Sequence, residues 1–413
     1  MQATSTAIEM FGPGYWDNAD EVAARLRQEG PAHRVVLPSG VPVWVVTRDE
    51  EARIAFNHRQ MTKDSATVRE VVGDALVEAG HPRRTSNMLE PSALFSDPPE
   101  HGRLRRPLQR VFTNRRIALL EPHVRQITRR LLDALPDEGV VDLIEAFAFP
   151  LPVTVICELL GVPPADRAPF RAWTAALMDD DPPTSTPASL AMGEYFGRLI
   201  AAKRARPDDG LLSALVQLAD TEHGLTEHEL IGTTFLLFVA GHETTMNLIG
   251  AMARWLMPDP HAWQALGADP GLVPAAVEEI LRWDSPVRMA THRVTTVDVD
   301  LGGVVIPARS IVLICLGAAN RDPRRHGAGA DVLDIHRADG VGHLTFGHGI
   351  HFCLGAPLAR MEARIALTEL TARFPRARLA VPARELRQSE SVIMKGLVGL
   401  PVEFRPPADS PRA

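Results

Sequence analysis

Cysteine, lysine and aromatic residues are scarce in this sequence of 413 residues. The three cysteines, Cys157, Cys315 and Cys353, form no CxxC pair. An odd number of distant cysteines argues against a disulfide framework or a zinc knuckle and suits a reducing cytosol. Aromatic residues make up 5% of the chain and the net charge is -7. We therefore expect no nucleic-acid partner, because such proteins usually carry a strongly basic surface.

Long apolar runs and a secretion signal are also missing. The first twenty residues, MQATSTAIEMFGPGYWDNAD, have neither a basic start nor an apolar stretch, so we expect no signal peptide. No apolar run reaches the length of a membrane span, so we expect a cytoplasmic protein without membrane contact. Only Lys63, Lys203 and Lys395 are lysines, and this preference for arginine suggests a high-GC bacterial genome.

The composition is otherwise that of a globular protein, with 45% hydrophobic and 23% charged residues. Proline and glycine are spread throughout, and we predict a single domain spanning residues 1–413. Two β-rich runs in residues 32–47 predict a hairpin, and helical sequence follows from about Arg48. Residues 294–316 predict another small sheet. Most of the remainder has helical periodicity, so the predicted fold class is mainly α with a minor β part.

The longest predicted helix begins with a capping-box pattern formed by Thr226 and Glu229 and runs to about Met257. It is apolar from residue 230 to residue 239. The polar segment AGHETTMN, residues 240–247, then interrupts a helix that we expect to be buried. The segment DDDPPTSTP, residues 179–187, predicts a loop.

The stretch FGHGIHFCLG, residues 346–355, surrounds Cys353 with glycines and histidines. Most free cysteines are small buried hydrophobes, which is our interpretation of Cys157 and Cys315. Cys353 differs because apolar residues at spacings of four, three and four predict a helix directly after it, with Pro357 in the first turn. The N-terminus of a helix favours a thiolate, so we predict that Cys353 is a ligand.

Glycines in this stretch, Gly347, Gly349 and Gly355, allow the backbone to turn tightly and to approach a flat ligand closely. The spacing FxxGxxxCxG is expected about 0.0005 times in a chain of this composition. The stretch resembles the cysteine-loop signature of the cytochrome P450 family of haem-thiolate monooxygenases. That resemblance implies the fold of this family, with a long central helix over haem b, the thiolate of Cys353 as axial ligand of the iron, and Phe346 beside it.

The segment AGHETT resembles the oxygen-activating part of the central helix in this family. The resemblance implies that Ala240 and Gly241 leave room over the iron, and that Glu243 and Thr244 are an acid–alcohol pair. Such a pair organises water to deliver protons in a nearly dry pocket. A zinc-protease helix with the pattern HExxH is the rival interpretation, and it is discarded because Met246 replaces the second histidine.

The sequence EEILRWDSPV contains Glu279 and Arg282, which lie three residues apart on one helix face. Taken alone, they predict an ordinary surface ion pair of little worth. The resemblance implies a buried clamp that positions the cysteine loop. Relatives usually place a basic residue where this chain has Val332, so we expect the third partner of the clamp to be replaced by Arg324 or Arg325.

By this resemblance, four basic residues occupy the positions that bind the haem propionates in the family. His101 and Arg105 lie four residues apart, hence on one helix face. Arg293 follows the ExxR segment, and His351 lies two residues before the cysteine. Any one of these residues, taken singly, predicts only a solvated surface side chain.

Residues 101–120 contain six arginines and no acidic residue. Usually such a run is a solvated face, but we prefer a docking face for an acidic redox partner, with Arg106 and Arg110 as the residues to test. No nicotinamide or flavin site is evident, because GVGHLTFG lacks the third glycine of GxGxxG. The resemblance therefore implies electrons from a ferredoxin and its reductase, and we expect a monomer.

In the wording of its motifs, the sequence most resembles actinobacterial members of the family that hydroxylate or epoxidise macrolides, other polyketides and steroid-like molecules. We therefore predict insertion of one oxygen atom of O₂ into a bulky apolar secondary metabolite. A peroxide-driven peroxygenase and a non-catalytic haem sensor are the alternatives. Arg288 either faces the substrate, where it would recognise a carboxylate or hydroxyl, or points away. The predicted pocket residues are Met88, Leu89, Phe235, Val239, Val287, Arg288, Met289, Ala290, Ile393 and Met394.

Overall fold

The computed structural model describes residues 10–12, 14–83, 92–178, 182–221, 224–337 and 342–405. Within these ranges the chain forms mainly helices with small sheets, as the sequence predicts. The helices are α1 (Tyr15–Glu29), α2 (Asp49–Asn57), α3 (Ser65–Glu78), α4 (Glu100–Val111), α5 (Asn114–Ala118), α6 (Glu121–Asp133), α7 (Pro150–Leu160), α8 (Ala168–Met178), α9 (Pro182–Ala205), α10 (Leu211–Ala219), α11 (Glu227–Leu256), α12 (Pro260–Ala268), α13 (Val273–Trp283), α14 (Leu316–Ala319), α15 (Pro323–His326) and α16 (Ala356–Arg373). The strands are β1 (Ala32–Val36), β2 (Pro42–Val46), β3 (Met61–Thr62), β4 (Gly139–Asp142), β5 (Met289–Thr295), β6 (Val299–Leu301), β7 (Val304–Ile306), β8 (Ile311–Cys315), β9 (Arg378–Leu379) and β10 (Pro401–Phe404).

The largest sheet has the strand order β1-β2-β8-β5-β3. β1 and β2 form the predicted antiparallel hairpin, with Arg34 opposite Trp44, and α2 follows it as expected. β8 pairs parallel with β2 and antiparallel with β5. The prediction of a separate sheet over residues 294–316 is therefore wrong for β5 and β8 and holds only for the β6–β7 ladder. All of β8 is buried, and a strand covered on both faces carries no alternation that would identify its partners.

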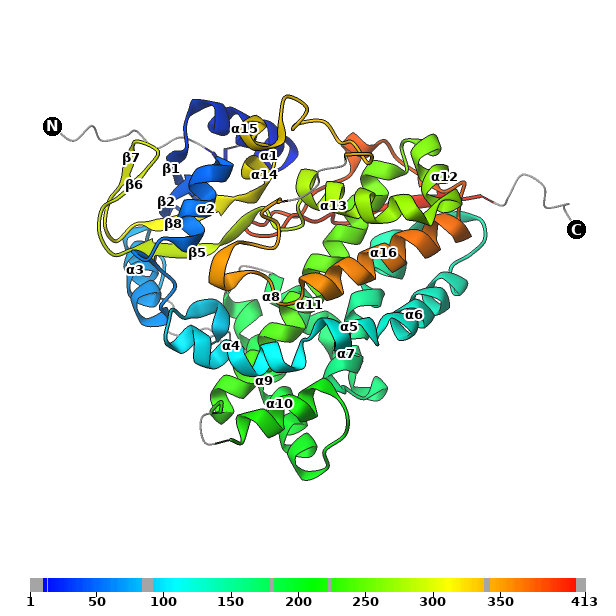
Figure 1. The fold of residues 1–413 in the computed structure, drawn as a ribbon, viewed down its shortest axis with the longest axis horizontal. Coiled ribbons are helices and arrows are strands. Elements are labelled where there is room, and N and C mark those ends of the chain that lie inside the picture. Colours follow the sequence, from blue (N-terminus) through cyan, green and yellow to red (C-terminus); the bar gives the residue numbers. More distant parts are fainter. Residues whose placement is uncertain are drawn as a thin grey trace, which may run out of the picture.

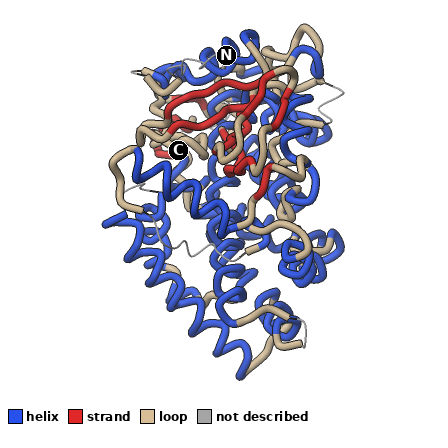
Figure 2. The backbone as a smooth tube through the Cα atoms, turned by 90° about the vertical axis from the view of Figure 1, so that its left-hand side faces the viewer, coloured by secondary structure: helices blue, strands red, loops and turns tan. Residues whose placement is uncertain are grey.

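The strands gather in one part of the molecule and the helices form the rest (Figure 2). In Figure 1 the largest sheet lies at upper left, near α1, α2 and α3, while α9 and α10 lie at the lower end. α11 and α16 pass through the middle of this view. α11 packs against α7, α9 and α16, so the longest helix is surrounded by other elements.

The predicted capping box begins α11. The Thr226 hydroxyl accepts a hydrogen bond from the Glu229 N–H at 3.3 Å, and the Glu229 carboxylate accepts one from the Thr226 N–H at 2.8 Å. The first half of α11 packs Phe235 and Phe238 into an apolar cluster with α4 and α7 to α10. The second half packs Leu248 into another cluster with α6, α13 and α16. The polar segment of residues 240–247 thus joins two apolar cores.

The loop predicted for residues 179–187 is wrong over most of its length. α9 begins at Pro182 and continues through Pro187, whereas residues 179–181 lie outside the described part. Proline is tolerated in the first turn of a helix, where its missing N–H would have no partner in any case; this accounts for Pro182 and Pro183 but not for Pro187, which lies inside the helix. The proline-rich composition therefore marks the start of a helix here.

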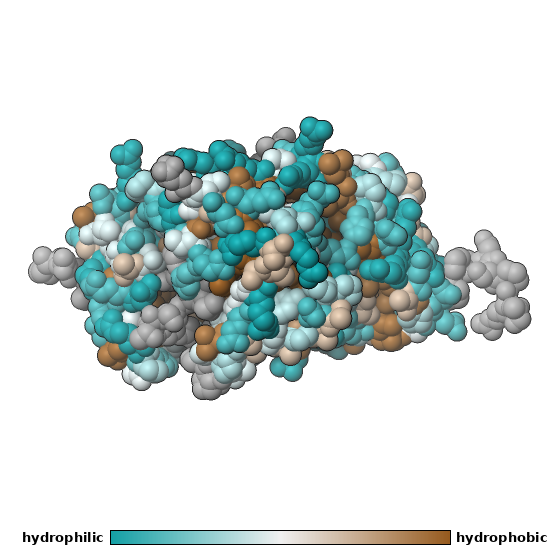
Figure 3. Space-filling model, turned by 90° about the horizontal axis from the view of Figure 1, so that it is seen from below, coloured by the Kyte–Doolittle hydropathy of each residue, from teal (hydrophilic) through white to brown (hydrophobic). Residues whose placement is uncertain are grey.

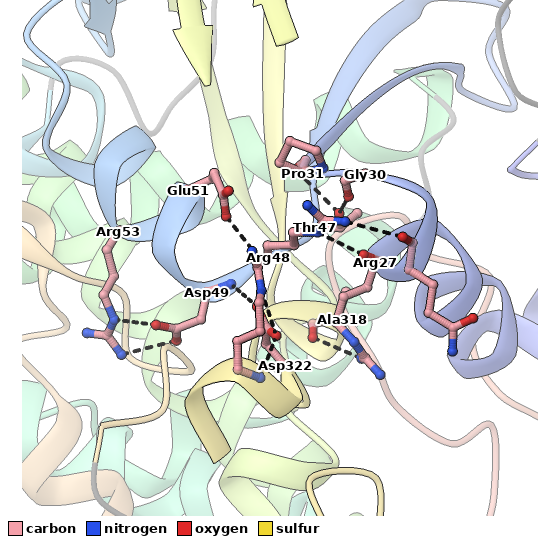
Figure 4. A network of polar contacts seen from close by, with 12 residues as sticks. Arg27, Gly30, Pro31, Thr47, Arg48, Asp49, Glu51, Arg53, Ala318 and Asp322 are labelled. Atoms are coloured by element: carbon pink, nitrogen blue, oxygen red, sulfur yellow. Dashed lines mark hydrogen bonds and ion pairs between the residues drawn. The ribbon is translucent and has the colours of Figure 1, made fainter. Parts of the chain in front are cut away.

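A network of polar contacts ties the sheet to the helices above it (Figure 4). The Thr47 hydroxyl donates to the Gly30 carbonyl at 2.8 Å, and the Asp49 N–H donates to the Asp322 carboxylate at 3.1 Å. Arg27 donates to a carbonyl of α14 at 3.1 Å. The bonds of Asp49 and Arg27 join residues 273 and 291 positions apart in the chain, and so fix α1 and α2 against the segment that follows β8.

The end of the molecule formed by α9 and α10 is shown from below in Figure 3. Hydrophilic residues cover most of this face, and hydrophobic residues appear between them. Among the described helices, none combines the length and the apolar character needed to cross a membrane.

Candidate active site

Cys353 lies in a tight loop directly before α16. Its N–H donates to the Phe346 carbonyl at 2.8 Å, which closes the loop. Gly347 and Gly349 have φ angles of 76° and 74°, in the left-handed region that favours glycine. Gly355 has an ordinary φ of -80°, and a Cβ there would lie 3.8 Å from the Cys353 sulfur. Two of the three predicted glycines are therefore required by the backbone.

The electrostatic surroundings of the Cys353 thiol differ from the expectation. The surrounding protein raises the pKa of the thiol by desolvation although the residue keeps accessible surface, while the N–H of Gly355, the charge of Arg105 and the N–H of Ala356 act in the opposite direction without reversing the shift. The N-terminus of α16 alone thus does not make the sulfur a thiolate. A bound metal cation would do so, because it deprotonates a coordinating thiol. The other two cysteines are buried, as predicted.

The Cys353 side chain has accessible surface although it sits among core elements. Ala240 is also exposed, in the middle of α11 and between the two apolar clusters. Leu354, next to the cysteine, packs against the cluster that contains the first half of α11. The exposed residues Cys353 and Ala240 thus lie on the loop before α16 and on α11, two helices that pack against each other.

The four basic residues predicted to bind propionates come together from α4, β5 and the cysteine loop. The rings of His101 and His351 meet edge to face, with their centroids 4.6 Å apart. Arg105 donates to the carbonyl of Phe352 at 2.5 Å. Arg293 is 3% exposed, and its positive charge acts on His351. Residues that are far apart in the sequence thus form one basic cluster beside Cys353.

This cluster has an excess of positive charge, and the charge of the Asp97 carboxylate opposes the effect of burial at Arg293 and His101 only in part. Within the described residues, no carboxylate forms an ion pair with Arg105 or Arg293, which donate only to backbone carbonyls. Burial lowers the pKa of Arg293 to about 10. It also lowers the pKa of His351 to about 2, and the charges of Lys63, His101, Arg293 and Arg105 add to the effect. The Nε2 atom of His101 is buried and has no hydrogen-bond partner.

Lys63 belongs to this cluster and was missed by sequence reasoning. It directly follows β3, and its Nζ donates to the Thr291 hydroxyl of β5 at 2.6 Å. The rarity of lysine was the sole signal in the sequence. Nothing in the local pattern around residue 63 indicates that it lies near His351.

The predicted acid–alcohol pair, Glu243 and Thr244, lies on α11, and each side chain forms a hydrogen bond with a residue one helical turn away. Thr244 donates to the Ala240 carbonyl at 3.0 Å, the usual bond of a threonine inside a helix. Glu243 accepts from the Asn247 amide at 3.4 Å. Burial raises the pKa of Glu243, and the bond from Asn247 opposes this only in part. Glu243 therefore retains a proton more readily than an exposed glutamate does.

Two glycines hold α11 close to its neighbours. A Cβ at Gly241 would lie 3.1 Å from the Ile156 side chain of α7, so this residue has a packing role against α7. A Cβ at Gly396 would collide with the side chain of Asn247. The chain segment before β10 thus abuts the residue that supports Glu243.

Comparison with known proteins agrees with this geometry. The family model described as cytochrome P450 matches residues 271–379, which include α13 and the cysteine loop. Cytochrome P450 107B1 of Saccharopolyspora erythraea is 46% identical over 92% of this chain and 93% of its own length.

The chain belongs to the cytochrome P450 family. The vitamin D(3) 25-hydroxylase of Pseudonocardia autotrophica is 43% identical over 98% of this chain and 99% of its own. The solved structure of the P450 monooxygenase TamI bound to tirandamycin C is 44% identical, covers 96% of this chain and 99% of its own, and has a TM-score of 0.88. The predicted family, fold class and monooxygenase class are confirmed.

Cytochromes P450 hold haem through a cysteine thiolate, and the residues of this chain fit that group. Haem is flat and carries two carboxylates. The thiol of Cys353 is exposed in the loop before α16, and the basic cluster beside it offers donors that form no ion pair with a carboxylate of the described residues. The unpartnered Nε2 of His101 points to a missing acceptor of the same kind.

The ExxR pair of this cytochrome P450 is a buried clamp. Arg282 donates from Nε and Nη2 to both carboxylate oxygens of Glu279, at 2.8 and 2.7 Å, and both side chains are at most 1% exposed. The third partner is Arg337, whose Nε lies 3.2 Å from Glu279.

The expectation that Arg324 or Arg325 replaces the third partner is wrong. Arg324 pairs with Asp322 and Glu51, and no bond joins either arginine to Glu279 within the described residues. Val332 is exposed at the surface. The turn after Val332 brings Arg337 back to the clamp, so a basic residue at position 332 is not needed.

The predicted substrate-pocket residues divide into accessible and packed groups. Met88 and Leu89 lie outside the described residues. Val239, Val287, Ile393 and Met394 are partly accessible, and Val287 and Met394 pair as an isolated β-bridge. The remaining residues, Phe235, Met289 and Ala290, are buried in apolar clusters, so these three predictions are corrected to core positions.

Arg288 does not face an accessible space. It is 4% exposed, and its guanidinium lies 5.7 Å from the ring of Tyr15 and 5.5 Å from that of Trp16. It donates to the Gln388 side chain at 3.2 Å. Of the two orientations that the sequence left open, the structure shows the one that points away, toward α1.

Proposed function

We propose that this protein is a haem-thiolate monooxygenase in which Cys353 holds haem b, and that it inserts one oxygen atom of O₂ into a bulky apolar secondary metabolite. One observation carries the proposal. A thiol with accessible surface lies beside a cluster of cations that form no ion pair with a carboxylate of the described residues, in the loop before α16, which packs against α11. In this arrangement Arg105, Arg293, His101 and His351 bind the carboxylates of the cofactor.

Bound haem supplies the metal at which O₂ is activated. The residues of α11 would then control protons and water. Glu243 is half-buried with a raised pKa, so it carries a proton near neutral pH more often than an exposed glutamate. The hydroxyl of Thr244, one residue further, would pass that proton on or hold a water molecule that does so.

The thiolate ligand is tested first. Cys353→Ser should abolish the thiolate-type absorption of the reduced carbon monoxide complex, whereas Cys157→Ala, which removes a buried cysteine elsewhere, should retain it. A carbon monoxide complex of the imidazole type in the unmodified protein would refute the assignment.

The proton-delivery role is tested with Glu243→Gln and Thr244→Ala. Each should lower product formation by about a hundredfold or more while the spectral response to substrate stays nearly unchanged. Thr245→Ala changes a buried neighbour on another side of α11 and is the matched control. Unchanged product formation per O₂ consumed in the first two variants would exclude the role.

We propose macrolides, other polyketides and steroid-like molecules as the substrate class. Relatives of this chain include a mycinamicin IV hydroxylase/epoxidase and a 6-deoxyerythronolide B hydroxylase, at 40% and 38% identity. Such molecules should displace water from the haem iron, which is seen as a shift of the Soret band. Absence of a shift across all three classes, together with a shift by small polar compounds, would contradict this proposal.

We propose that electrons come from a ferredoxin that docks on α4 and α5. Arg106, Arg110, Arg115 and Arg116 are exposed, and within the described residues none of them forms an ion pair. Unpaired surface cations attract an acidic partner and steer its approach. Because Arg105 donates to the carbonyl of Phe352 beside Cys353, this surface adjoins the cysteine loop.

Charge reversal at Arg106 and Arg110 should slow reduction by ferredoxin and weaken its dependence on salt concentration. The same reversal at Arg198 and Arg206, exposed residues of α9 and its C-terminal end, is the control. Equal reduction rates in both double variants would exclude docking on α4 and α5.

A further inference from the structure

Lys63 is a buried lysine in the basic cluster. It is 1% exposed, and its Nζ donates to the Thr291 hydroxyl at 2.6 Å and to the His292 carbonyl at 3.4 Å. The ammonium lies 5.2 Å from the centre of the Phe95 ring. Three neutral groups thus hold the side chain in one place, directly after the edge strand β3 and against β5.

No carboxylate within the described residues forms an ion pair with Lys63. The charge of Asp97 acts on the Lys63 ammonium. The Asp97 carboxylate, however, accepts hydrogen bonds from the Thr62 hydroxyl and from the backbone N–H of Lys63, the latter at 3.0 Å. Burial lowers the pKa of Lys63, and the charge of Arg293 lowers it further. The charge of Asp97 acts on both Lys63 and Arg293, and two buried cations with one carboxylate between them leave an excess of positive charge, which is unfavourable unless a further anion is bound beside them.

The neighbours of Lys63 indicate where that anion lies. β3 pairs antiparallel with β5, and Thr62, the residue before Lys63, lies opposite Val294, the residue after Arg293. The Lys63 ammonium itself bonds to Thr291 and to the carbonyl of His292, the residue before Arg293. Lys63 therefore lies beside Arg293, one of the four residues assigned above to the carboxylates of haem.

We propose that Lys63 is a fifth group that binds the haem carboxylates, and that it helps to retain the cofactor. This inference rests on the proposed function. The bond to Thr291 orients the amine, and the haem carboxylates supply negative charge beyond that of Asp97. The role is one of binding and charge compensation, distinct from the positioning of O₂ or substrate.

The test is the rate at which the holoenzyme loses haem to excess apomyoglobin. Lys63→Gln keeps a donor for Thr291 but removes the charge, and Lys63→Met removes both. Each should release haem about tenfold faster or more, which corresponds to one charge-assisted hydrogen bond. Lys203→Gln is the control, because Lys203 pairs with Asp208 on α9, away from the cluster.

A second arm uses haem dimethyl ester, whose carboxylates carry no charge. If Lys63 acts on the carboxylates, the difference between the unmodified protein and Lys63→Gln should disappear with the ester. Should Lys63→Met fail to fold, Lys63→Gln carries the comparison.

Three results would overturn the proposal. Haem loss from Lys63→Gln at the unmodified rate would mean that the charge has no role. An equal acceleration with haem and with its ester would mean that Lys63 only supports β3 and β5. If haem is lost faster from Lys203→Gln as well, the effect is not specific. Failure of the proposed function is distinct, since the unmodified protein would then lack a thiolate-ligated haem.

Discussion

Arg337 offers a quantitative test of the clamp around Glu279. Its Nε donates to the buried carboxylate at 3.2 Å, and its Nη2 donates to the carbonyls of Gly329 and Val332 at 2.8 and 3.2 Å. Replacement by methionine removes these bonds but leaves Arg282 paired with Glu279. The loss of a hydrogen bond to a charged group costs about 1.5–3 kcal/mol, so we expect Arg337→Met to lower the free energy of unfolding by about 2–3 kcal/mol.

Two other variants bracket this value. Arg282→Met leaves the Glu279 carboxylate without its main partner and should cost about 3–5 kcal/mol. Arg324→Met, the residue that the sequence suggested for the clamp, removes a half-exposed side chain from Asp322 and Glu51 and should cost less than about 1 kcal/mol.

The assay is chemical unfolding of the haem-loaded protein, followed by circular dichroism and by the haem absorption band. In Arg337→Met we also expect a larger fraction of the reduced carbon monoxide complex to lose its thiolate-type spectrum, because the clamp supports the cysteine loop. If Arg337→Met and Arg324→Met unfold at the same denaturant concentration, the assignment of Arg337 as third partner is refuted.

Three further changes have defined outcomes. Burial raises the pKa of Glu278, but hydrogen bonds from His343 and Arg360 outweigh it and lower the pKa to about 2. The ionised carboxylate therefore contributes up to about 3 kcal/mol to stability. This contribution is complete above about pH 4.5 and is lost as the pH falls toward 2. Glu278→Gln should therefore lose less unfolding free energy than the unmodified protein between pH 6 and pH 3, and equal losses would contradict the pairing. Gly396→Ala places a Cβ against Asn247 and should lower stability by about 1–3 kcal/mol, seen as a lower thermal midpoint, whereas an unchanged midpoint would show that the neighbours can yield. Thr226→Ala removes the cap of α11 and should cost about 1 kcal/mol in chemical unfolding, while Thr226→Ser should cost little.

The long central helix and the cysteine loop were predictable because their signals are local. The capping box at Thr226 and Glu229 lies within four residues, and the apolar spacing after Cys353 defines α16. The positive φ angles at Gly347 and Gly349 follow from the same short stretch. Local hydrogen bonds and helix periodicity decide these features, whatever the rest of the chain does.

The partners of buried charges were not predictable, because they depend on distant packing. Arg337 reaches Glu279 across 58 positions, and Lys63 reaches Thr291 across 228. A sequence pattern reports that an arginine or lysine is present but does not report which carboxylate or hydroxyl it meets. For the same reason Phe235 and Met289 were expected at the pocket and proved to be core residues.

Because β2 pairs in parallel with β8, one edge of β2 stays uncovered until the chain has been made as far as β8. The hairpin of β1 and β2 leaves the ribosome early, but about 265 more residues must be made before Ile311 arrives to cover the free edge of β2. At typical bacterial elongation speeds this takes roughly 13–50 s. During that time an apolar strand edge stands open to other nascent chains, so the yield of this enzyme in a host cell should depend on chaperones that bind the first 50 residues.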